Sequence, residues 1–369
     1  MNQNHKRCNR CVMDTTDPDI DFDEKGHCSH CRSYFEHIKA LKEKNTYAPA
    51  HLENIVQRIK ENGRGKDYDS ILGVSGGIDS SFTAYYAKKL GLHPLLVHFD
   101  NGWNSELSVK NIENIVKKLE FDLYTYVIDW EEFKDLQRSF IKASVVDIEM
   151  LTDHAIMATM FKLAKENKIK YVLSGENIAT EYIMPKSWLY HKKDIRNIKG
   201  IQKIYGNKRI IKFPIFGLSG LILSRFIAKI EYVTILNYIG YNKNEAIRIL
   251  QNEIDWRYYG GKHYESVFTK FYQAYILPVK FKIDKRRAHL SNLICSGQIT
   301  RNEALEELNK ELYDTTELIQ EKEYVIKKLD FLEKEFDQHM RMPPISHLDY
   351  PNSMWLINVG RKVRKLFDT

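Results

Sequence analysis

The stretch Gly73-Val74-Ser75-Gly76-Gly77-Ile78-Asp79-Ser80-Ser81 decides the fold of this chain. It follows a short apolar run that reads as a strand, and it precedes residues 82–90, which read as a helix. Glycines let the backbone approach a ligand closely, and a helix N-terminus offers free N–H groups and the positive end of a dipole. The three serines can add hydrogen bonds, and Asp79 can hold Mg²⁺. The stretch therefore predicts a phosphate-binding turn.

The spacing of this turn differs from the Walker loop and from the dinucleotide motif Gly-x-Gly-x-x-Gly. An ordinary glycine-containing turn with a serine or aspartate helix cap is the plain alternative. Ser75-Gly76-Gly77-Ile78-Asp79-Ser80 resembles, position for position, the SGGxDS signature of the PP-loop ATP pyrophosphatases. The resemblance implies that ATP is split between its α and β phosphates. AMP would be attached to a substrate oxygen and then displaced by a nucleophile such as ammonia or sulfur.

Length and composition set wide bounds on the function. The chain has 369 residues, 43% hydrophobic residues and a net charge of +7. This length favours more than one domain, and the mild basic excess suits anionic substrates without requiring nucleic acid. No apolar run has the length of a membrane span, and the first residues lack the apolar core of a signal peptide. We expect a cytoplasmic protein with no membrane association, and a nucleic-acid partner is not favoured.

Four of the five cysteines form two close pairs near the N-terminus, at Cys8, Cys11, Cys28 and Cys31. Two C-x2-C pairs separated by sixteen residues are typical of a zinc ribbon, in which four thiolates hold a tetrahedral ion. Four protein ligands leave no open position, so we expect a structural rather than a catalytic Zn²⁺. We assign the ribbon to residues 1–48.

Strand-like and helix-like runs alternate between residues 67 and 215. After a connecting helix at 49–66, strands are expected at 70–74, 93–99, 122–127 and 171–174, with helices at 80–90, 105–119 and 151–167. Such alternation favours an α/β fold with a doubly wound parallel sheet, here of the PP-loop (HUP-like) type. We therefore expect three domains: the ribbon at 1–48, a PP-loop ATP pyrophosphatase domain at 49–215, and a mainly helical substrate or partner region at 216–369.

Ligands of such sheets bind beyond the carboxyl ends of the strands. His98 and Asp100 end the second expected strand, and Gly175 follows the fourth. The superfamily resemblance implies that these residues contact the adenosine of ATP. A core histidine and a plain turn are the alternatives.

Residues 186–212 combine nine Lys or Arg residues and three large aromatic residues with a single acid. This mixture could hold single-stranded RNA, the diphosphate of a nucleotide-sugar or a partner protein, or it could be a solvated insertion. Lys212-Phe213-Pro214 resembles the basic residue and proline that often close a PP-loop site. Lys212 is therefore a candidate pyrophosphate contact.

The stretch 255–290 is dense in aromatic and cationic residues, with Gly260-Gly261-Lys262-His263 between two aromatic runs. Ordinary helices do not need this pattern, so it favours the wall of a site. Together with the ribbon and the SGGxDS loop, it resembles the N-acetyl sugar amidotransferases of the WbpG/PseA type, which act in bacterial surface polysaccharide (lipopolysaccharide) and nonulosonic acid biosynthesis. The resemblance covers most of the chain.

The family resemblance implies that an acetamido group of a sugar or nucleotide-sugar becomes an acetamidino group. The amide oxygen would take AMP from ATP, pyrophosphate would leave, and ammonia would then expel AMP. Nothing in the chain looks like a glutaminase, because Cys295 is the only cysteine outside the ribbon. The family implies a separate glutaminase subunit (HisH-like), similar to that of imidazole-glycerol-phosphate synthase, with a HisF-like barrel companion.

Site residues follow from these readings. We expect Ser75, Gly76, Gly77, Asp79, Ser80 and Ser81 to bind pyrophosphate and Mg²⁺. Lys262 and His263, with Asp79 and Lys212, are the candidate catalytic residues. Lys285, Arg286 and Arg287 could bind a substrate carboxylate or phosphate, although a solvated surface cluster is the alternative.

The rival function is a PP-loop tRNA thiolase or other tRNA-modifying enzyme, which would suit the ribbon and the basic segment. Sulfur-transfer enzymes commonly need cysteines in the catalytic domain, and residues 67–215 contain none. A non-enzymatic nucleotide sensor would keep the loop but would not need the 255–290 run.

Overall fold

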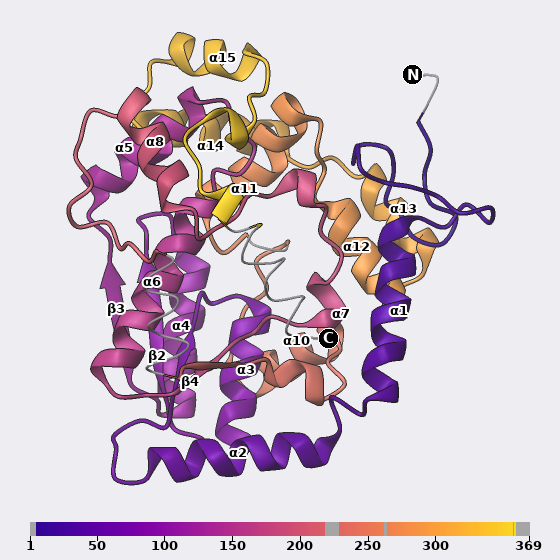
Figure 1. The fold of residues 1–369 in the computed structure, drawn as a ribbon, viewed down its shortest axis with the longest axis vertical. Coiled ribbons are helices and arrows are strands. Elements are labelled where there is room, and N and C mark those ends of the chain that lie inside the picture. The colour runs from indigo at the N-terminus through magenta and orange to yellow at the C-terminus, as the bar shows by residue number, and fades with distance from the viewer. Residues whose placement is uncertain (1–4, 218–228, 262–263, 357, 359–369) are drawn as a thin grey trace.

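A five-stranded parallel sheet forms the centre of the chain in the computed structural model (Figure 1). The structure describes residues 5–217, 229–261, 264–356 and 358. The strand order is β3-β2-β1-β4-β5, and every neighbouring pair is parallel. The strands are β1 (Ser70–Gly73), β2 (Pro94–Asp100), β3 (Leu123–Val127), β4 (Tyr171–Leu173) and β5 (Glu231–Val233).

Helices cover both faces of this sheet because alternate strand residues point to opposite sides. Leu72 packs in a core with apolar residues of α2 (Pro49–Gly63), α3 (Ile78–Lys89), α4 (Glu106–Leu119) and α10 (Lys243–Ile254). Its neighbour Ile71 packs in a second core with residues of α6 (Met150–Glu166). The doubly wound α/β fold expected from the sequence is therefore confirmed.

The strand order contains a switch point beside β1. The chain builds β1, β2 and β3 outward in one direction and then crosses back, so that β4 pairs with the other edge of β1. Crossover loops diverge at such a point and leave a crevice at the carboxyl ends of the two strands. The loop that leads from β1 into α3 and the loop that leads from β4 into α7 (Ile178–Glu181) both begin at this crevice.

Two elements of this domain were not expected from the sequence. α5 (Trp130–Lys142) lies between β3 and α6, and its buried face includes Phe133, Leu136 and Phe140. β5 lies beyond residue 215, so the segment expected to be mainly helical also supplies one strand to the sheet. Three residues are too few to show the alternation that marks a strand in sequence.

The C-terminal part is helical, as expected. Its elements are α11 (Val267–Phe271), a π-helix η4 (Tyr272–Phe281), α12 (Arg286–Cys295), α13 (Arg301–Asn309), α14 (Thr315–Lys328), α15 (Glu333–Arg341) and the short turn η5 (His347–Asp349). The other described elements are α1 (Ser29–Glu43), η1 (Lys186–Trp188), α8 (Ile195–Tyr205) and η3 (Ile235–Tyr238). In the described ranges no helix combines the length and the apolar character that crossing a bilayer requires.

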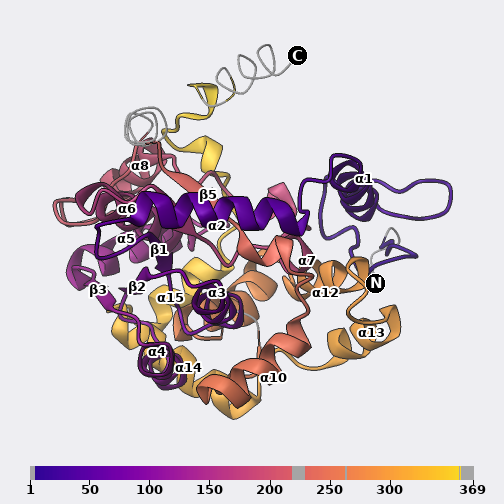
Figure 2. The same cartoon turned by 90° about the horizontal axis from the view of Figure 1, so that it is seen from below.

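The N-terminal ribbon packs on the C-terminal helices rather than on the sheet. Figures 1 and 2 both place α1 on the side of the molecule opposite β3, next to α12 and α13. The Ser291 hydroxyl accepts a hydrogen bond from the Val12 amide at 3.2 Å, and Arg301 donates to the carbonyls of Cys8 and Cys11 at 3.0 and 3.2 Å. Hydrogen bonds thus join the ribbon to α12 and α13.

Candidate active site

The turn after β1 has a backbone that requires glycine. Gly76 has a φ of +77°, and a Cβ atom there would lie 2.5 Å from the carbonyl oxygen of Ser108. Gly77 precedes the first turn of α3, and a Cβ atom there would lie 3.0 Å from both the Ser75 hydroxyl and the Glu265 carboxylate. A side chain at Gly76 would therefore collide with fixed backbone, whereas one at Gly77 would crowd two side chains of the site.

The hydroxyls of the turn are organised around its backbone. Ser75 Oγ accepts a hydrogen bond from the Gly77 amide at 3.2 Å, and Ser80 Oγ accepts one from the Ser75 amide at 3.3 Å. Ser81 is fully buried, and its hydroxyl makes no hydrogen bond with any residue in the described ranges. The structure thus gathers the predicted serines and glycines at the start of α3, as an anion-binding turn requires.

Asp79 lies in the first turn of α3, where its carboxylate accepts a hydrogen bond from the Tyr241 hydroxyl. Burial, reinforced by the charge of Asp79, raises the pKa of Tyr241, so the phenol keeps its proton and acts as the donor. No sequence motif marks Tyr241, which lies between η3 and α10.

The stretch 255–266 folds over this turn. Trp256 Nε1 donates to the Gly76 carbonyl at 2.9 Å, and the Tyr259 hydroxyl accepts from the Ile78 amide at 3.2 Å. Glu265 Oε1 lies 3.3 Å from Ser75 Oγ, within hydrogen-bond distance. The expected site wall therefore contacts the phosphate-binding turn directly. Tyr259 and Glu265 are functional candidates that lay inside this stretch but were not singled out in the sequence.

Two predicted catalytic residues of the same stretch, Lys262 and His263, lie outside the described residues.

Asn111 of α4 holds the turn and this stretch together. Its Nδ2 atom donates to the carbonyls of Gly76 at 3.3 Å and Arg257 at 2.9 Å, and its Oδ1 atom accepts from the Arg257 amide at 2.8 Å. One buried amide side chain therefore fixes the distance between two segments that are far apart in sequence.

The residues proposed to contact adenosine occupy the ends of β2 and β4. His98 is buried, with Nδ1 donating to the Val74 carbonyl at 3.2 Å and Nε2 accepting from Asn104 at 3.1 Å. Burial lowers the pKa of His98, consistent with a neutral ring whose two nitrogens are both used within the chain. Asp100 Oδ1 accepts from the Gly102 amide at 2.9 Å and from Asn104 at 3.0 Å.

Gly175 has a different physical reason to be glycine. A Cβ atom there would lie 2.9 Å from the carbonyl carbon of Asp79 and 3.0 Å from the Ser80 amide nitrogen. The loop after β4 therefore packs directly on the first turn of α3, and both loops border the switch-point crevice.

Lys212 lies away from this turn. Its Nζ atom forms an ion pair with Asp129 Oδ2 at 2.9 Å, just after β3, and this bond lowers the pKa of Asp129. The Lys212 backbone amide donates to the Glu132 carboxylate at 2.9 Å. Because β3 is two strands from β1 in the sheet, the structure does not bring Lys212 next to Ser75 or Asp79.

The three consecutive cations Lys285, Arg286 and Arg287 point to three different surroundings. Arg286 donates to Asp284 and to the carbonyls of Glu307 and Lys310 at the end of α13. Arg287 pairs with the buried Asp14 of the ribbon at 2.6 Å. Lys285 is 8% exposed, and its Nζ atom lies 5.4 Å from the centre of the Tyr272 ring. They do not form one cationic cluster.

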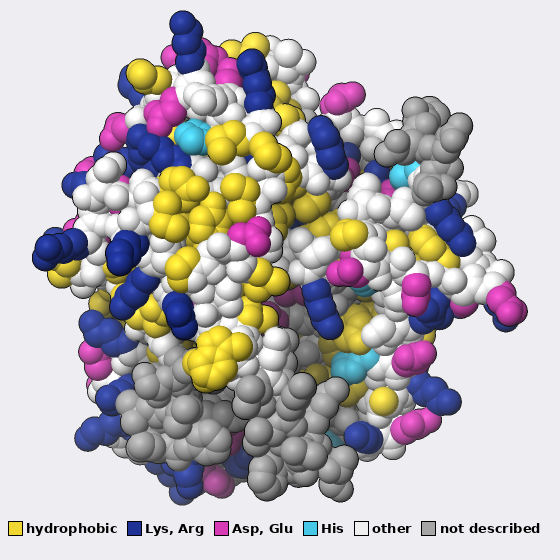
Figure 3. Space-filling model, turned by 45° about the horizontal axis from the view of Figure 1, so that its top comes forward, with side chains coloured by type: hydrophobic (Ala, Val, Ile, Leu, Met, Phe, Trp, Pro, Cys, Tyr) yellow, Lys and Arg dark blue, Asp and Glu magenta, His cyan; other side chains and the backbone are white. Residues whose placement is uncertain are grey.

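Asp147 and Glu149 lie close enough to Lys285 to feel its charge, and with Asp153 we call them the acidic cluster. Burial raises the pKa of Asp147, and it raises the pKa of Glu149 to about 7. Asp153 forms an ion pair with Lys192 at 2.6 Å. Figure 3 shows a hollow between the main body and the side that carries α1.

The four cysteines form a buried cluster. Their sulfur atoms all lie within 4.8 Å of one another, and all four residues have no exposed surface. The amides of Cys11 and Cys28 point at Cys8 Sγ, at 3.4 and 3.2 Å. Four convergent thiols with N–H donors to sulfur are a donor set that could bind a metal ion.

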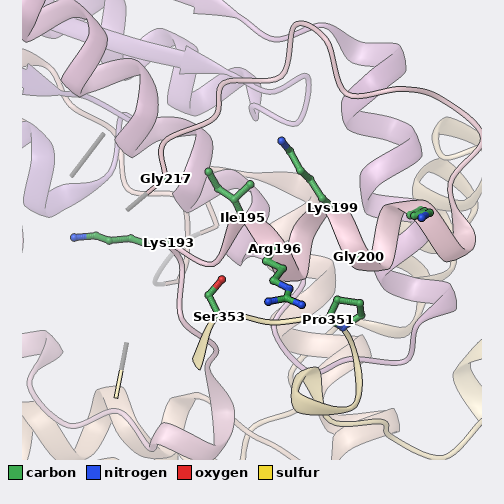
Figure 4. Close-up of a pocket in the computed structure, with 9 residues that line it drawn as sticks. Lys193, Ile195, Arg196, Lys199, Gly200, Gly217, Pro351 and Ser353 are labelled. Atoms are coloured by element: carbon green, nitrogen blue, oxygen red, sulfur yellow. The ribbon is translucent and has the colours of Figure 1, made fainter. Parts of the chain in front are cut away.

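A pocket of about 610 Å³ lies elsewhere, along α8 (Figure 4). Its cationic lining includes Lys193, Arg196 and Lys199 from the basic segment. In Figure 4, Lys193 and Lys199 point away from each other, whereas Arg196 lies toward Ser353 and Pro351. The basic residues therefore do not converge on one ligand position in this pocket.

Comparisons with known proteins agree with this division of the chain. Residues 65–181 match a family described as thiamine biosynthesis protein (ThiI), and residues 265–364 match the family described as LPS biosynthesis protein WbpG-like, C-terminal domain. An uncharacterized protein of Methanocaldococcus jannaschii is 28% identical over 127 residues, or 34% of this chain. The chain spans 41% of the length of this curated relative.

Solved structures are similar only at low scores. NMN synthetase from Francisella tularensis is 17% identical over 36% of this chain and 56% of that chain, with a TM-score of 0.29. The U34-tRNA thiolase NcsA from Methanococcus maripaludis, solved with its 4Fe–4S cluster, is 11% identical over 85% of this chain and 95% of that chain, with a TM-score of 0.34. Scores this low carry no argument about function.

The parallel sheet, the glycine-serine turn at its switch point and the match over 65–181 define an ATP-using enzyme of the PP-loop pyrophosphatase class. Within that class, the second match places a WbpG-like C-terminal domain after the PP-loop domain. The two matches together make this chain similar to WbpG-type PP-loop proteins.

Proposed function

We propose that this enzyme is an ATP-dependent, AMP-forming amidotransferase that converts an acetamido group of a sugar or nucleotide-sugar to an acetamidino group. The observation that carries the proposal is the contact of Glu265 and Tyr259 with the PP-loop turn. Glu265 is the first residue of the WbpG-like match. The part of the chain that resembles sugar-modifying proteins therefore borders the place where ATP would be activated. Bacterial surface polysaccharide biosynthesis is the proposed setting.

In this reaction the amide oxygen forms a bond to the α-phosphorus of ATP, and the bond to pyrophosphate breaks. Ammonia then adds to the activated carbon, and AMP leaves with the former amide oxygen. Ser75, Gly76, Gly77, Ser80 and Ser81 would hold the departing pyrophosphate with N–H and hydroxyl donors.

Asp79 would hold the Mg²⁺ ion, which supplies charge neutralisation for the phosphates. His98, Asp100 and Gly175 would border the adenosine. Lys212, Lys262 and His263 remain proposed contributors to phosphate neutralisation or amide orientation. For Lys212 this role needs release from Asp129.

The four-cysteine cluster is proposed to hold a structural Zn²⁺ ion. Buried thiols with N–H donors to sulfur suit a tetrahedral Zn²⁺, and four protein ligands leave no position for substrate. The ion would fix the ribbon against α12 and α13.

We propose that ammonia comes from a separate glutaminase subunit with a barrel companion. Cys295 is an unsuitable glutaminase nucleophile, because burial raises the pKa of its thiol to about 12. Its buried position also denies access to glutamine.

The second candidate function is a tRNA thiolase, which the match to the ThiI family favours. The ThiI match covers residues 65–181, and that range contains no cysteine to carry sulfur. This absence weighs against sulfur transfer by the PP-loop domain.

One experiment separates the two functions. The protein is incubated with ATP, Mg²⁺, ammonium and a panel of N-acetylated sugars and nucleotide-sugars, and AMP and the sugar mass are measured. AMP release with replacement of oxygen by NH, a loss of about one dalton, is expected. AMP release only with unmodified tRNA and a sulfur donor would favour the thiolase, and cleavage of ATP to ADP alone would contradict both.

A further inference from the structure

Glu149 joins the start of α6 to α11, the helix that follows the segment in contact with the PP-loop turn. It precedes α6, and its Oε2 atom accepts a hydrogen bond from the Thr269 hydroxyl of α11 at 2.7 Å. Thr269 follows Glu265 by four residues in sequence, and Glu265 lies 3.3 Å from Ser75. Thr152, in the first turn of α6, lies 3.5 Å from the side chain of Asn101, which follows β2. The start of α6 therefore lies at the carboxyl end of the sheet, on the side where the PP-loop turn begins.

One oxygen of this carboxylate has no hydrogen bond to any residue in the described ranges. The Thr269 hydroxyl is the sole described partner of the Glu149 carboxylate, and it uses Oε2. Oε1 therefore remains an acceptor for a ligand. The side chain is partly exposed, so a ligand can reach it.

Lys285 supplies an unpaired donor beside it. Its side chain is more than nine-tenths buried, yet no acceptor among the described residues bonds its Nζ atom, which faces the Tyr272 ring. The positive charge of Lys285 acts on both Asp147 and Glu149 and opposes the rise that burial causes in their pKa. The Nζ atom itself is not fully buried, so a ligand oxygen can reach it and accept a hydrogen bond.

An unpaired donor next to an unpaired acceptor complements a secondary amide, whose carbonyl accepts and whose N–H donates. We propose that Lys285 and Glu149 bind the acetamido group of the acceptor, with Lys285 on the oxygen and Glu149 on the N–H. This inference rests on the proposed function. It names the group recognised and the two side chains that recognise it.

The same placement gives Glu149 a role in proton transfer. As the amide oxygen bonds to the α-phosphorus, pyrophosphate leaves with the electron pair of the broken bond, and the amide N–H proton passes to Glu149. The product is a neutral adenylated imidate. A carbonyl oxygen has two lone pairs, so one can accept from Lys285 while the other attacks.

The groups around Glu149 set the pKa of its carboxylate and therefore its ability to accept that proton. Asp147 and Asp153 raise the pKa of Glu149, while Lys285 and the Thr269 hydroxyl lower it. Tyr272 of η4 keeps its proton, because burial raises its pKa well above the ordinary value.

Binding can be measured without turnover. N-acetylated sugars, free, UDP-linked and CMP-linked, are titrated into the full-length protein by calorimetry, each against its counterpart with a hydroxyl in place of the acetamido group. We expect at least one acetamido sugar to bind about tenfold or more tightly than its counterpart, as one lost pair of hydrogen bonds implies. Lys285→Met and Glu149→Gln should each abolish that preference. Lys282→Met and Glu166→Gln, at exposed positions of the neighbouring loop and of the same helix, should keep it.

Each outcome decides one proposal. A wild-type protein that binds no acetamido sugar better than its counterpart, or variants that keep the preference, would overturn the subsite. AMP formation with an unchanged acceptor KM in both variants would overturn the subsite and leave the amidotransferase function standing. If the variants lose the preference but no sugar supports AMP formation, the subsite stands and the amidotransferase function is overturned. If only one of Lys285→Met and Glu149→Gln folds, its result decides whether the subsite exists. If neither folds, Glu149→Asp, whose side chain is one methylene shorter, replaces them.

Discussion

The Oε1 atom of Glu265 lies 3.3 Å from the Oγ atom of Ser75, although 190 residues separate them in sequence. The contact places a carboxylate at the N-terminal end of α3, where the helix dipole and free amides favour an anion. Tyr259 holds the Ile78 amide in the same place. Two side chains of the chain itself therefore occupy positions that suit phosphate oxygens.

Glu265→Gln should strengthen the binding of pyrophosphate measured without Mg²⁺, because a like charge next to the anion is removed. We expect a gain of about three- to tenfold, the size of one partly screened Coulomb interaction. Calorimetric titration with pyrophosphate gives the measurement, and Glu253→Gln on the exposed side of α10 is the control. Unchanged or weaker binding would mean that the carboxylate does not compete for this place.

Gly76→Ala should remove the ATP site. The new Cβ atom would lie 2.5 Å from the Ser108 carbonyl at a positive φ, so the turn must change shape. Gly65→Ala is the matched control, since it has a φ of +73° with nothing within 4 Å of its Cβ position. The control should lose about 1 kcal/mol of unfolding free energy from backbone strain alone. Gly76→Ala should lose more, together with ATP binding, and equal effects in both variants would refute the steric argument.

Asp79→Asn should lower the rate of AMP formation by about 100- to 1000-fold, as expected for loss of one strong electrostatic contact to the reacting phosphates. Asp67→Asn, an exposed change at the opposite end of β1, should leave the rate unaltered. The rate is followed by chromatography of AMP at saturating ATP. A variant that turns over normally would remove Asp79 from the proposed site.

Cys28→Ser should release the bound metal and destabilise the contact between the ribbon and the C-terminal helices. We expect a fall in Tm of roughly 5–10 °C, because structural metal binding adds directly to folding free energy. Metal content measured by mass spectrometry should fall to zero in the variant. Cys295→Ser, at the cysteine outside the cluster, should keep its metal, and equal loss from both would contradict the four-cysteine assignment.

Glu149→Gln should stabilise the fold at pH 8 but not at pH 4. The folded state raises the pKa of Glu149 from the usual 4.5 to about 7, so it holds the proton more tightly than the unfolded chain does. Stability is therefore lost as pH rises from 4.5 to about 7, and Gln abolishes that loss. The gain at pH 8 should be on the order of 1–3 kcal/mol. Denaturant unfolding at the two pH values tests this, and a gain of equal size at both would show a cause other than titration.

Local signals in the sequence were sufficient to predict strands β1 to β4 of the sheet and the turn after β1. Ser70–Gly73 is apolar and is followed at once by glycines, so both the strand and its loop could be recognised. The four cysteines likewise carry their spacing in the sequence, and the structure brings their sulfur atoms together.

Contacts between distant segments could not be predicted in this way. Arg286 and Arg287 follow Lys285 directly in sequence. Arg286 nevertheless bonds an aspartate and two backbone carbonyls, whereas Arg287 pairs with an aspartate of the ribbon. Glu149 lies in no recognisable motif. It is proposed as a site residue because of the positions of Thr269 and Lys285, which come more than a hundred residues later in sequence. Which cation stays unpaired depends on tertiary packing, which a single sequence does not display.

Asn111 gives the molecule a mechanical property that follows from its three hydrogen bonds. Since the same amide binds the PP-loop turn and the backbone of Arg257, neither segment can shift without straining the other. A shift of the turn on nucleotide binding would therefore displace the segment that leads to Glu265. Conversely, a shift of that segment on acceptor binding would displace the turn and the nucleotide bound to it.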